Sequence, residues 1–268
     1  MDDDRPVDLL RNLKQLLEAD HWFGVESLPK PPESEQPAPA QRPGGVGAKR
    51  GADEAPAVAS PAPSVKPHPV ADIPSTVHGA EVLAAIVERI SACERCGLCA
   101  KRTKVVPGEG AAQPDILFIG EGPGADEDRQ GRPFVGAAGQ LLDRMIVAMG
   151  YAREQVYIAN VVKCRPPGNR APEPGEVADC LPYLERQIEA LQPKVICTLG
   201  NTPLRALSGN PQAGITRLRG KPFEYRGYTV IPTFHPSYLL RNDAGKKPCW
   251  EDLKAVLAFL GKEPPKRG

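Results

Sequence analysis

Four short runs of β-branched and other apolar residues, each followed by a helical pattern, constrain the fold of this chain most strongly. The runs span residues 115–119, 156–161, 194–199 and 228–233. The helical patterns behind them span residues 136–149, 174–191, 201–207 and 248–260, and a further one spans 81–91. Strands that alternate with helices imply right-handed crossovers and a parallel sheet that is covered on both faces. The sequence therefore predicts an α/β fold, a three-layer α/β/α sandwich with a four-stranded parallel sheet.

A proline-rich stretch separates this pattern from the N-terminus. Residues 28–75 contain 12 of the 31 prolines and no aromatic side chain. Such a stretch cannot bury enough apolar surface to offset the entropy lost on ordering, so we expect a disordered linker. Leucines that share one helical face predict an amphipathic leader helix within residues 1–27, which docks on the domain or on a partner protein, or else stays largely unfolded. The domain itself is expected at residues 76–268.

The charges divide along the same boundary. Residues 1–75 carry 8 Lys and Arg against 12 Asp and Glu, whereas residues 76–268 carry 26 against 21. A mildly basic domain permits a polyanionic partner without requiring one. The acidic start Met1–Asp4 lacks the positive charge and following apolar run of a signal peptide, so we expect a cytoplasmic protein with no membrane partner. We also expect the protein to be a monomer.

The seven cysteines favour metal ligation or redox chemistry, because disulfides are rare inside cells. Cys93 and Cys96 form a C-x-x-C pair, Cys99 follows at the same interval, and a proline-rich loop separates Cys164 from Cys180. Four closely spaced thiolates suit zinc or an iron–sulfur cluster equally well, with free structural thiols as the alternative, and the spacing leaves open which C-x-x-C pair is used. The other two cysteines are expected to be small buried hydrophobes: Cys197 and Cys249.

Polar side chains follow three of the predicted strands, namely Glu121, Asn160 and His235. Ligands of open α/β sheets bind beyond the carboxyl ends of the strands, so we expect these side chains to converge. The glycine loop at residues 120–124 fits a phosphate-binding loop poorly, because Pro123 removes an amide donor. We interpret it as a turn that brings the backbone close to a flat ligand and directs Glu121 or Glu127 toward it.

Two further features point to a planar, phosphate-bearing ligand. Phe134 lies in a loop between glycines, either as a core anchor or as a stacking platform for a base. Beyond His235, whose backbone is restricted by Pro236, Arg241 and Asn242 are placed to contact phosphate.

Three longer motifs resemble those of a known family. They are GEGPGADED with GRPFVG in residues 120–136, NVVKCRPPGNRAP in residues 160–172, and HPSYLLRN in residues 235–242. Together they are similar to family 4 uracil-DNA glycosylases, the iron–sulfur branch of that superfamily, over residues 90–260. The resemblance implies a four-stranded α/β/α sandwich and removal of uracil from single- or double-stranded DNA by hydrolysis of its N-glycosidic bond.

The resemblance also implies roles for individual residues. A [4Fe–4S] cluster would be held by Cys93, Cys96, Cys164 and Cys180. The uracil pocket would consist of five residues: Glu121, Gly122, Phe134, Asn160 and His235. His235 would stabilise the departing uracil, and Glu121 or Glu127 would act on water or on the sugar. A related enzyme traps its DNA through a histidine in an inserted loop, which residues 167–171 lack, so we expect turnover. The alternatives are a non-catalytic or a covalently trapping iron–sulfur protein that binds uracil-DNA.

Overall fold

The computed structural model describes residues 68–73 and 78–265. The predicted leader helix at residues 1–27 and most of the predicted linker at 28–75 lie outside the described residues. The last part of that linker packs on the domain: Val70 is buried, and Asp72 forms an ion pair with Arg89.

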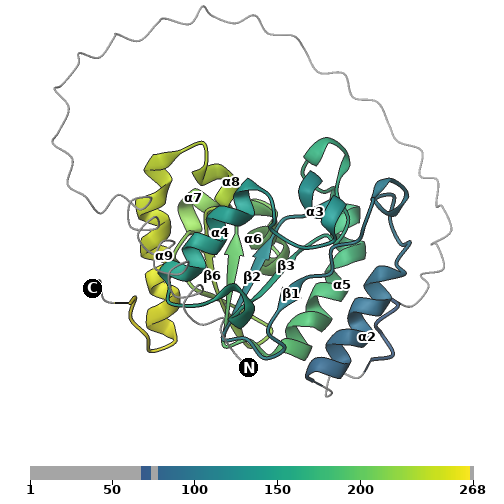
Figure 1. Cartoon of the computed structure of the whole chain (residues 1–268), viewed down its shortest axis with the longest axis horizontal. Coiled ribbons are helices and arrows are strands. Elements are labelled where there is room, and N and C mark those ends of the chain that lie inside the picture. The colour runs from purple at the N-terminus through teal and green to yellow at the C-terminus, as the bar shows by residue number, and fades with distance from the viewer. Residues whose placement is uncertain (1–67, 74–77, 266–268) are drawn as a thin grey trace, which may run out of the picture. The chain divides into compact units, whose positions relative to one another are not determined.

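A mixed sheet of six strands forms the centre of the domain (Figure 1), in the order β1-β3-β2-β4-β6-β5. In chain order the strands are β1 (Glu109–Gly110), β2 (Ile116–Gly120), β3 (Tyr157–Asn160), β4 (Val195–Leu199), β5 (Phe223–Tyr225) and β6 (Tyr228–Thr233). The strands β3, β2, β4 and β6 pair in parallel, and β1 and β5 pair antiparallel at the two edges. The chain therefore continues to β3 on one side of β2 and later to β4 on the other, which places a topological switch point beyond Gly120.

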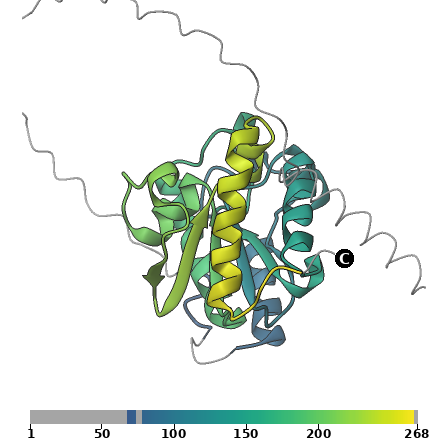
Figure 2. The same cartoon turned by 90° about the vertical axis from the view of Figure 1, so that its left-hand side faces the viewer.

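Helices cover both faces of the sheet, as Figures 1 and 2 show. The longer helices are α2 (Ala80–Ser91), α4 (Ala137–Ala148), α5 (Pro174–Leu191), α6 (Asn201–Ser208) and α9 (Lys246–Phe259). Shorter helices are α3 (Ala125–Gln130), α7 (Ile215–Leu218) and α8 (Pro236–Leu239), and 3₁₀ turns lie at Cys99–Lys101, Arg153–Gln155, Pro167–Asn169 and Asp243–Gly245. None of the helices within the described residues is long and apolar enough to cross a membrane.

Alternate side chains of each buried strand enter two separate hydrophobic cores. On β2, Ile116 and Phe118 pack with α4 and α9, whereas Leu117 and Ile119 pack with α2 and α5. Every residue of β2, β3 and β4 is buried, as expected for parallel strands covered on both sides. With both faces covered, a ligand of such a sheet binds beyond the carboxyl ends of its strands.

The sheet differs from the four strands predicted from the sequence, because it carries two short edge strands. The two residues of β1 are too few to produce an apolar pattern. The strand β5 joins β6 through a two-residue hairpin in which Arg226 and Gly227 have φ of 50° and 85°. Positive φ at both positions is typical of the type I′ turn, which matches the twist of the paired strands.

Candidate active site

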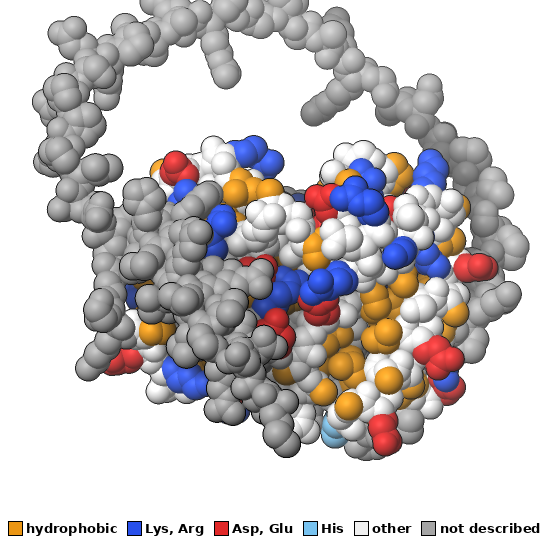
Figure 3. Space-filling model, in the orientation of Figure 1, with side chains coloured by type: hydrophobic (Ala, Val, Ile, Leu, Met, Phe, Trp, Pro, Cys, Tyr) orange, Lys and Arg blue, Asp and Glu red, His pale blue; other side chains and the backbone are white. Residues whose placement is uncertain are grey.

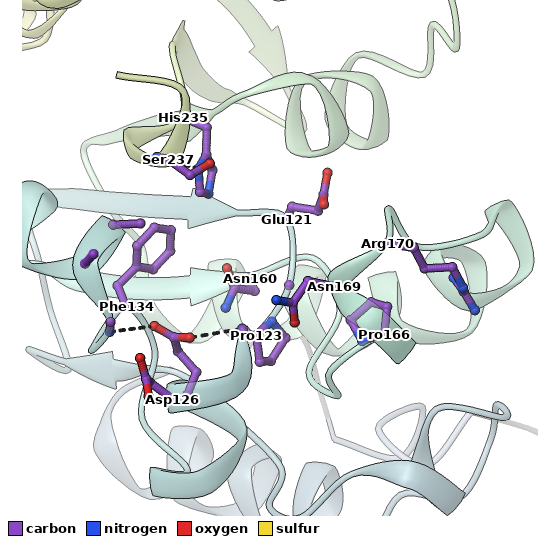
Figure 4. A pocket seen from close by; sticks show the side chains of 16 residues that line it. Glu121, Pro123, Asp126, Phe134, Asn160, Pro166, Asn169, Arg170, His235 and Ser237 are labelled. Carbon is purple, nitrogen blue, oxygen red and sulfur yellow. Dashed lines mark hydrogen bonds between the residues drawn. The ribbon is translucent and has the colours of Figure 1, made fainter. Parts of the chain in front are cut away.

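The residues predicted beyond the strands line one cavity of about 300 Å³. Glu121 and Gly122 follow β2, Asn160 ends β3, and His235 follows β6, while Phe134 comes from the loop between α3 and α4. Figure 4 shows the Phe134, Asn160 and His235 side chains around the same space, with Arg170 at its far side. The five residues predicted to form a pocket therefore do lie together.

Asn160 supplies the buried polar group of this cavity. Its side chain is 1% exposed, and its Oδ1 atom has no hydrogen-bond partner within the described part of the chain. A buried acceptor without a partner is costly, so such groups are usually satisfied by a ligand, a water or an ion. The backbone carbonyl oxygen of Asn160 accepts a hydrogen bond of 2.8 Å from the buried Lys163 ammonium.

Phe134 forms a flat wall of the cavity and also belongs to the hydrophobic core. Its ring centroid lies 5.6 Å from that of His235, with 33° between the ring planes. A Cβ atom on Gly120 would lie 2.5 Å from Phe134 Cζ and would also collide with Asn160 Oδ1. The two interpretations of Phe134 from the sequence, a core anchor and a stacking platform, are thus compatible. Glycine at position 120 keeps the space between Phe134 and Asn160 open.

The hydrogen bonds of His235 determine where its ring carries a proton. The Ser237 backbone N–H donates to Nδ1 at 3.1 Å, and the Ser237 hydroxyl lies 2.7 Å from the same atom. A backbone N–H can only donate, so Nδ1 is an acceptor and a neutral ring carries its proton on Nε2. Desolvation, reinforced by the Arg241 charge and opposed by Glu127, lowers the pKa of His235 to about 4. The ring is therefore neutral at physiological pH.

The two candidate carboxylates have different surroundings. Glu127 is buried, and its oxygens accept hydrogen bonds from the backbone N–H groups of Gly124 (3.0 Å), Val135 (2.9 Å) and Gly136 (2.9 Å). Glu121 is half-buried, and one of its oxygens accepts a 2.5 Å hydrogen bond from the Thr202 hydroxyl on α6. Glu127 thus ties the glycine loop to the Phe134 loop, whereas Glu121 faces the cavity from the end of β2.

A second cavity of about 350 Å³ adjoins the first and shares Glu121 and His235 with it. Arg241 lines this second cavity and is exposed. Asn242 lines neither of the two cavities, and its side-chain amide donates to the Tyr238 hydroxyl. On the face drawn in Figure 3, basic side chains lie on both sides of the notch between α8 and α3, so cations flank the approach to the site.

Four of the seven cysteines share one of the two hydrophobic cores. Cys164 and Cys180 belong to the hydrophobic core beneath α2 and α5, and Cys93 and Cys96 pack against that core. Cys99 is absent from it, as far as the described residues go. Cys197 and Cys249 are fully buried in the opposite core, which confirms their prediction as small hydrophobes.

Hydrogen-bond donors surround this group of four thiols. Arg102 donates to Cys164 Sγ at 3.2 Å, and the Lys163 backbone N–H donates to Cys180 Sγ at 3.3 Å. The Tyr183 hydroxyl interacts with the Cys93 thiol, and the buried Arg95 Nε lacks a hydrogen-bond partner among the described residues. Burial raises the pKa of the Cys180 thiol to about 12 and also raises the pKa of Cys96 and Cys164. A buried N–H donor without a partner, together with donors aimed at desolvated sulfurs, fits an anionic, acceptor-rich group at this position.

No three His, Cys, Asp or Glu side chains among residues 68–73 and 78–265 converge so closely that they could hold one metal ion. An iron–sulfur cluster makes a different demand, because each of its four thiolates binds a separate iron atom. The donor set, four free thiols with N–H and O–H groups around them, therefore fits a [4Fe–4S] cluster.

Several residues at the site were not predicted from the sequence. Ser237 fixes the His235 tautomer, and its position in the His-Pro-Ser motif was a usable signal. Thr202, Lys163 and Arg153 contact Glu121, Asn160 and the Phe134 loop, respectively. They lie 81, 3 and 19 residues from those partners in the chain, and nothing in the sequence pattern marks the contacts. Their roles depend on tertiary packing alone.

Comparison with known proteins places the chain in a family. The model of the uracil DNA glycosylase superfamily matches residues 107–254. The type-4 uracil-DNA glycosylase of Thermotoga maritima is 47% identical over 186 residues, covering 68% of this chain and 97% of that protein. The type-4 enzymes of Sulfurisphaera tokodaii and Archaeoglobus fulgidus are 45% and 42% identical, covering 65% and 69% of this chain and 83% and 96% of those proteins. The chain therefore belongs to the uracil DNA glycosylase superfamily and, within it, to the type-4 uracil-DNA glycosylases.

Proposed function

We propose that this chain removes uracil from DNA by hydrolysing the N-glycosidic bond, leaving an abasic site. The observation that carries the proposal is the buried, unpartnered Asn160 Oδ1 in a cavity walled by an aromatic ring. Uracil presents an N3–H donor beside its O4 acceptor, which the acceptor and donor of one amide match. Cytosine presents an acceptor beside an amino donor, so the same amide in the same orientation rejects it. A base must leave the duplex stack to reach this site.

Phe134 stacks on the flipped uracil, and Gly122 allows the backbone to approach it closely. His235 donates a hydrogen bond from Nε2 to a uracil carbonyl oxygen. Negative charge grows on that oxygen as the glycosidic bond breaks, so this donor stabilises the transition state more than the bound substrate. A neutral imidazole suits the task, because it donates without placing a full charge in the desolvated pocket.

Glu121 is the carboxylate that acts in catalysis, either by positioning water or by supporting the cationic sugar. It borders both cavities and is held by Thr202. Glu127 acts as a positioning residue instead, because its two oxygens already accept three backbone hydrogen bonds. Arg241 contacts a DNA phosphate near the flipped nucleotide, and Asn242 supports that contact through Tyr238.

A [4Fe–4S] cluster is held by Cys93, Cys96, Cys164 and Cys180. Cys164 begins the proline-rich loop whose residues Pro166 and Asn169 line the uracil cavity. The cluster therefore fixes that loop at the DNA surface and has no redox role in hydrolysis. If the rate of uracil release followed the oxidation state of the cluster while the fold stayed intact, this structural role would be wrong.

The remaining assignments follow from the same site. We infer that the domain of residues 76–268 acts as a monomer. Its partner is uracil-containing DNA, single- or double-stranded, inside the cell. The leader helix at 1–27 docks on a protein partner or on the domain, and the linker at 28–75 tethers it.

Incubating the full chain with a uracil-containing single-stranded oligonucleotide should produce strand breaks at uracil after alkali treatment. Many turnovers per enzyme and no covalent adduct on a denaturing gel are expected, because residues 167–171 contain no histidine. A matched oligonucleotide with cytosine in place of uracil serves as the control. Cluster-loaded protein that breaks no strand, or that stops after one turnover as an adduct, would refute the hydrolytic assignment.

The replacement Gly120→Ala should lower the rate of uracil release by roughly 10²-fold while the domain stays folded. The new methyl group would occupy the space between Phe134 and Asn160, and displacements of about 1 Å in an active site can cost that much. Gly175→Ala in the first turn of α5 is the control, since a Cβ there meets nothing within 4 Å. A G120A enzyme with full activity would show that uracil does not bind between these side chains.

A further inference from the structure

The backbone of Phe134 adopts a conformation that its own residue type disfavours. Its φ is 50°, in the left-handed region, although its side chain is a bulky aromatic that is only 6% exposed. Non-glycine residues stay in this region only where the surroundings hold them there. The direction in which the Phe134 ring faces the uracil cavity therefore depends on whatever fixes its peptide groups.

Two charged side chains hold the loop on either side of Phe134. Downstream, Glu127 accepts hydrogen bonds from the N–H groups of Val135 and Gly136. Upstream, the Arg153 guanidinium donates to the carbonyl oxygens of Pro133 at 2.5 Å and Phe134 at 3.2 Å. The two carbonyl groups flank the Phe134 Cα, so Arg153 constrains both peptide planes that define its φ and ψ.

Arg153 is itself anchored by two carboxylates. Its Nη1 donates to Asp143 on α4 at 2.6 Å, and its Nε donates to Glu109 on β1 at 3.0 Å. The Arg153 side chain is only 14% exposed. Arg132 shares Glu109 but is 57% exposed, and its guanidinium donates to the two Glu109 oxygens. Of the two arginines on Glu109, Arg153 is thus the one whose guanidinium holds the loop backbone.

We propose that Arg153 is a positioning residue for uracil binding: it holds Phe134 in the left-handed conformation that presents its ring to the flipped base. This inference rests on the proposed role of Phe134 as the stacking platform. A planar guanidinium with several N–H donors is required, because the same group must donate to two carbonyl oxygens and two carboxylates at once. Lysine retains the charge but cannot reproduce that geometry.

The test measures inhibition by free uracil together with single-turnover rates for four proteins and one control. Arg153→Lys and Phe134→Ala should each weaken inhibition by free uracil about tenfold or more. The double variant should be little weaker than Phe134→Ala alone, since a residue that acts through Phe134 loses its effect once the ring is gone. The control R132M, which loses only the exposed ion pair, should bind uracil like the parent chain.

The outcomes separate the inference from the function on which it rests. If Phe134→Ala leaves uracil inhibition unchanged, the stacking role of Phe134 fails, and this inference fails with it. If Phe134→Ala weakens inhibition but R153K does not, or if the two effects multiply in the double variant, stacking stands and the positioning role of Arg153 is wrong. A purely structural role would lower the melting temperature without the non-additive effect on uracil.

Discussion

Replacing His235 with leucine should lower the single-turnover rate of uracil release by about 10²–10³-fold, the usual penalty for losing one donor to a developing oxyanion. Binding of uracil-DNA should change much less, because the lost hydrogen bond strengthens only as the glycosidic bond breaks. Rapid-quench measurement with excess enzyme isolates this step from product release. The control is H78N, since His78 is exposed and pairs with the Glu189 carbonyl oxygen at 2.7 Å.

The pH profile gives an independent check on His235. With a pKa of about 4, the ring stays neutral as the pH falls from 8 to about 5, so the single-turnover rate should not follow an ionisation near 6.5. The same shift affects stability. The unfolded chain binds the proton more readily, so the contribution of His235 to the free energy of unfolding is complete above about pH 6.5 and falls as the pH approaches 4. A rate that halves near pH 6.5 in H78N as well as in the parent chain would contradict the neutral-histidine mechanism.

Replacing Cys180 with alanine should remove the cluster and most of the stability of the domain. Purified C180A protein should lose the brown colour and contain far less than the ~4 iron atoms per chain of a [4Fe–4S] protein. Its melting temperature should fall by roughly 10 °C or more, because each kcal/mol lost shifts a domain of this size by ~2–4 °C and bound metal contributes several. Iron content, visible absorption and a thermal melt measure all three effects.

Cys99→Ala provides the matched control for this prediction. Cys99 also lies one C-x-x-C interval from Cys96, yet it packs outside the core that holds Cys164 and Cys180. C99A protein should keep its colour, iron content and melting temperature. If C99A lost the cluster and Cys93→Ala did not, the ligand set would be Cys96, Cys99, Cys164 and Cys180 instead.

The central strands could be predicted from the sequence because β2, β3 and β4 are buried along their whole length and β6 along most of its length. Runs rich in β-branched and other apolar residues place β2, β3, β4 and β6 within one residue of their observed ends. The edge strands lack this signal, since β1 has two residues and β5 alternates between half-buried and exposed positions. A positive-φ pair at Arg226 and Gly227 forms the hairpin, but arginine is not a residue that marks such a turn.

The site was predictable to the extent that topology determines it. Residues that follow parallel strands must meet at one edge of the sheet, which is why Glu121, Asn160 and His235 converge. Which of Glu121 and Glu127 is the better candidate for catalysis could not be predicted from the sequence. The distinction depends on three backbone N–H groups that only the folded loops bring to Glu127. The same holds for Arg153, which lies 19 residues from Phe134 in the chain.

The two edge strands also bear on self-association. An open sheet ends in rows of unpaired N–H and C=O groups, and a long, flat edge invites pairing with another chain. Here the long parallel strands are enclosed by antiparallel strands of two and three residues, β1 and β5. A neighbouring copy would find too few consecutive groups to extend the sheet. Strand addition is therefore blocked at both edges of the sheet. The carboxyl ends of the parallel strands, where the site lies, stay open for a nucleic acid.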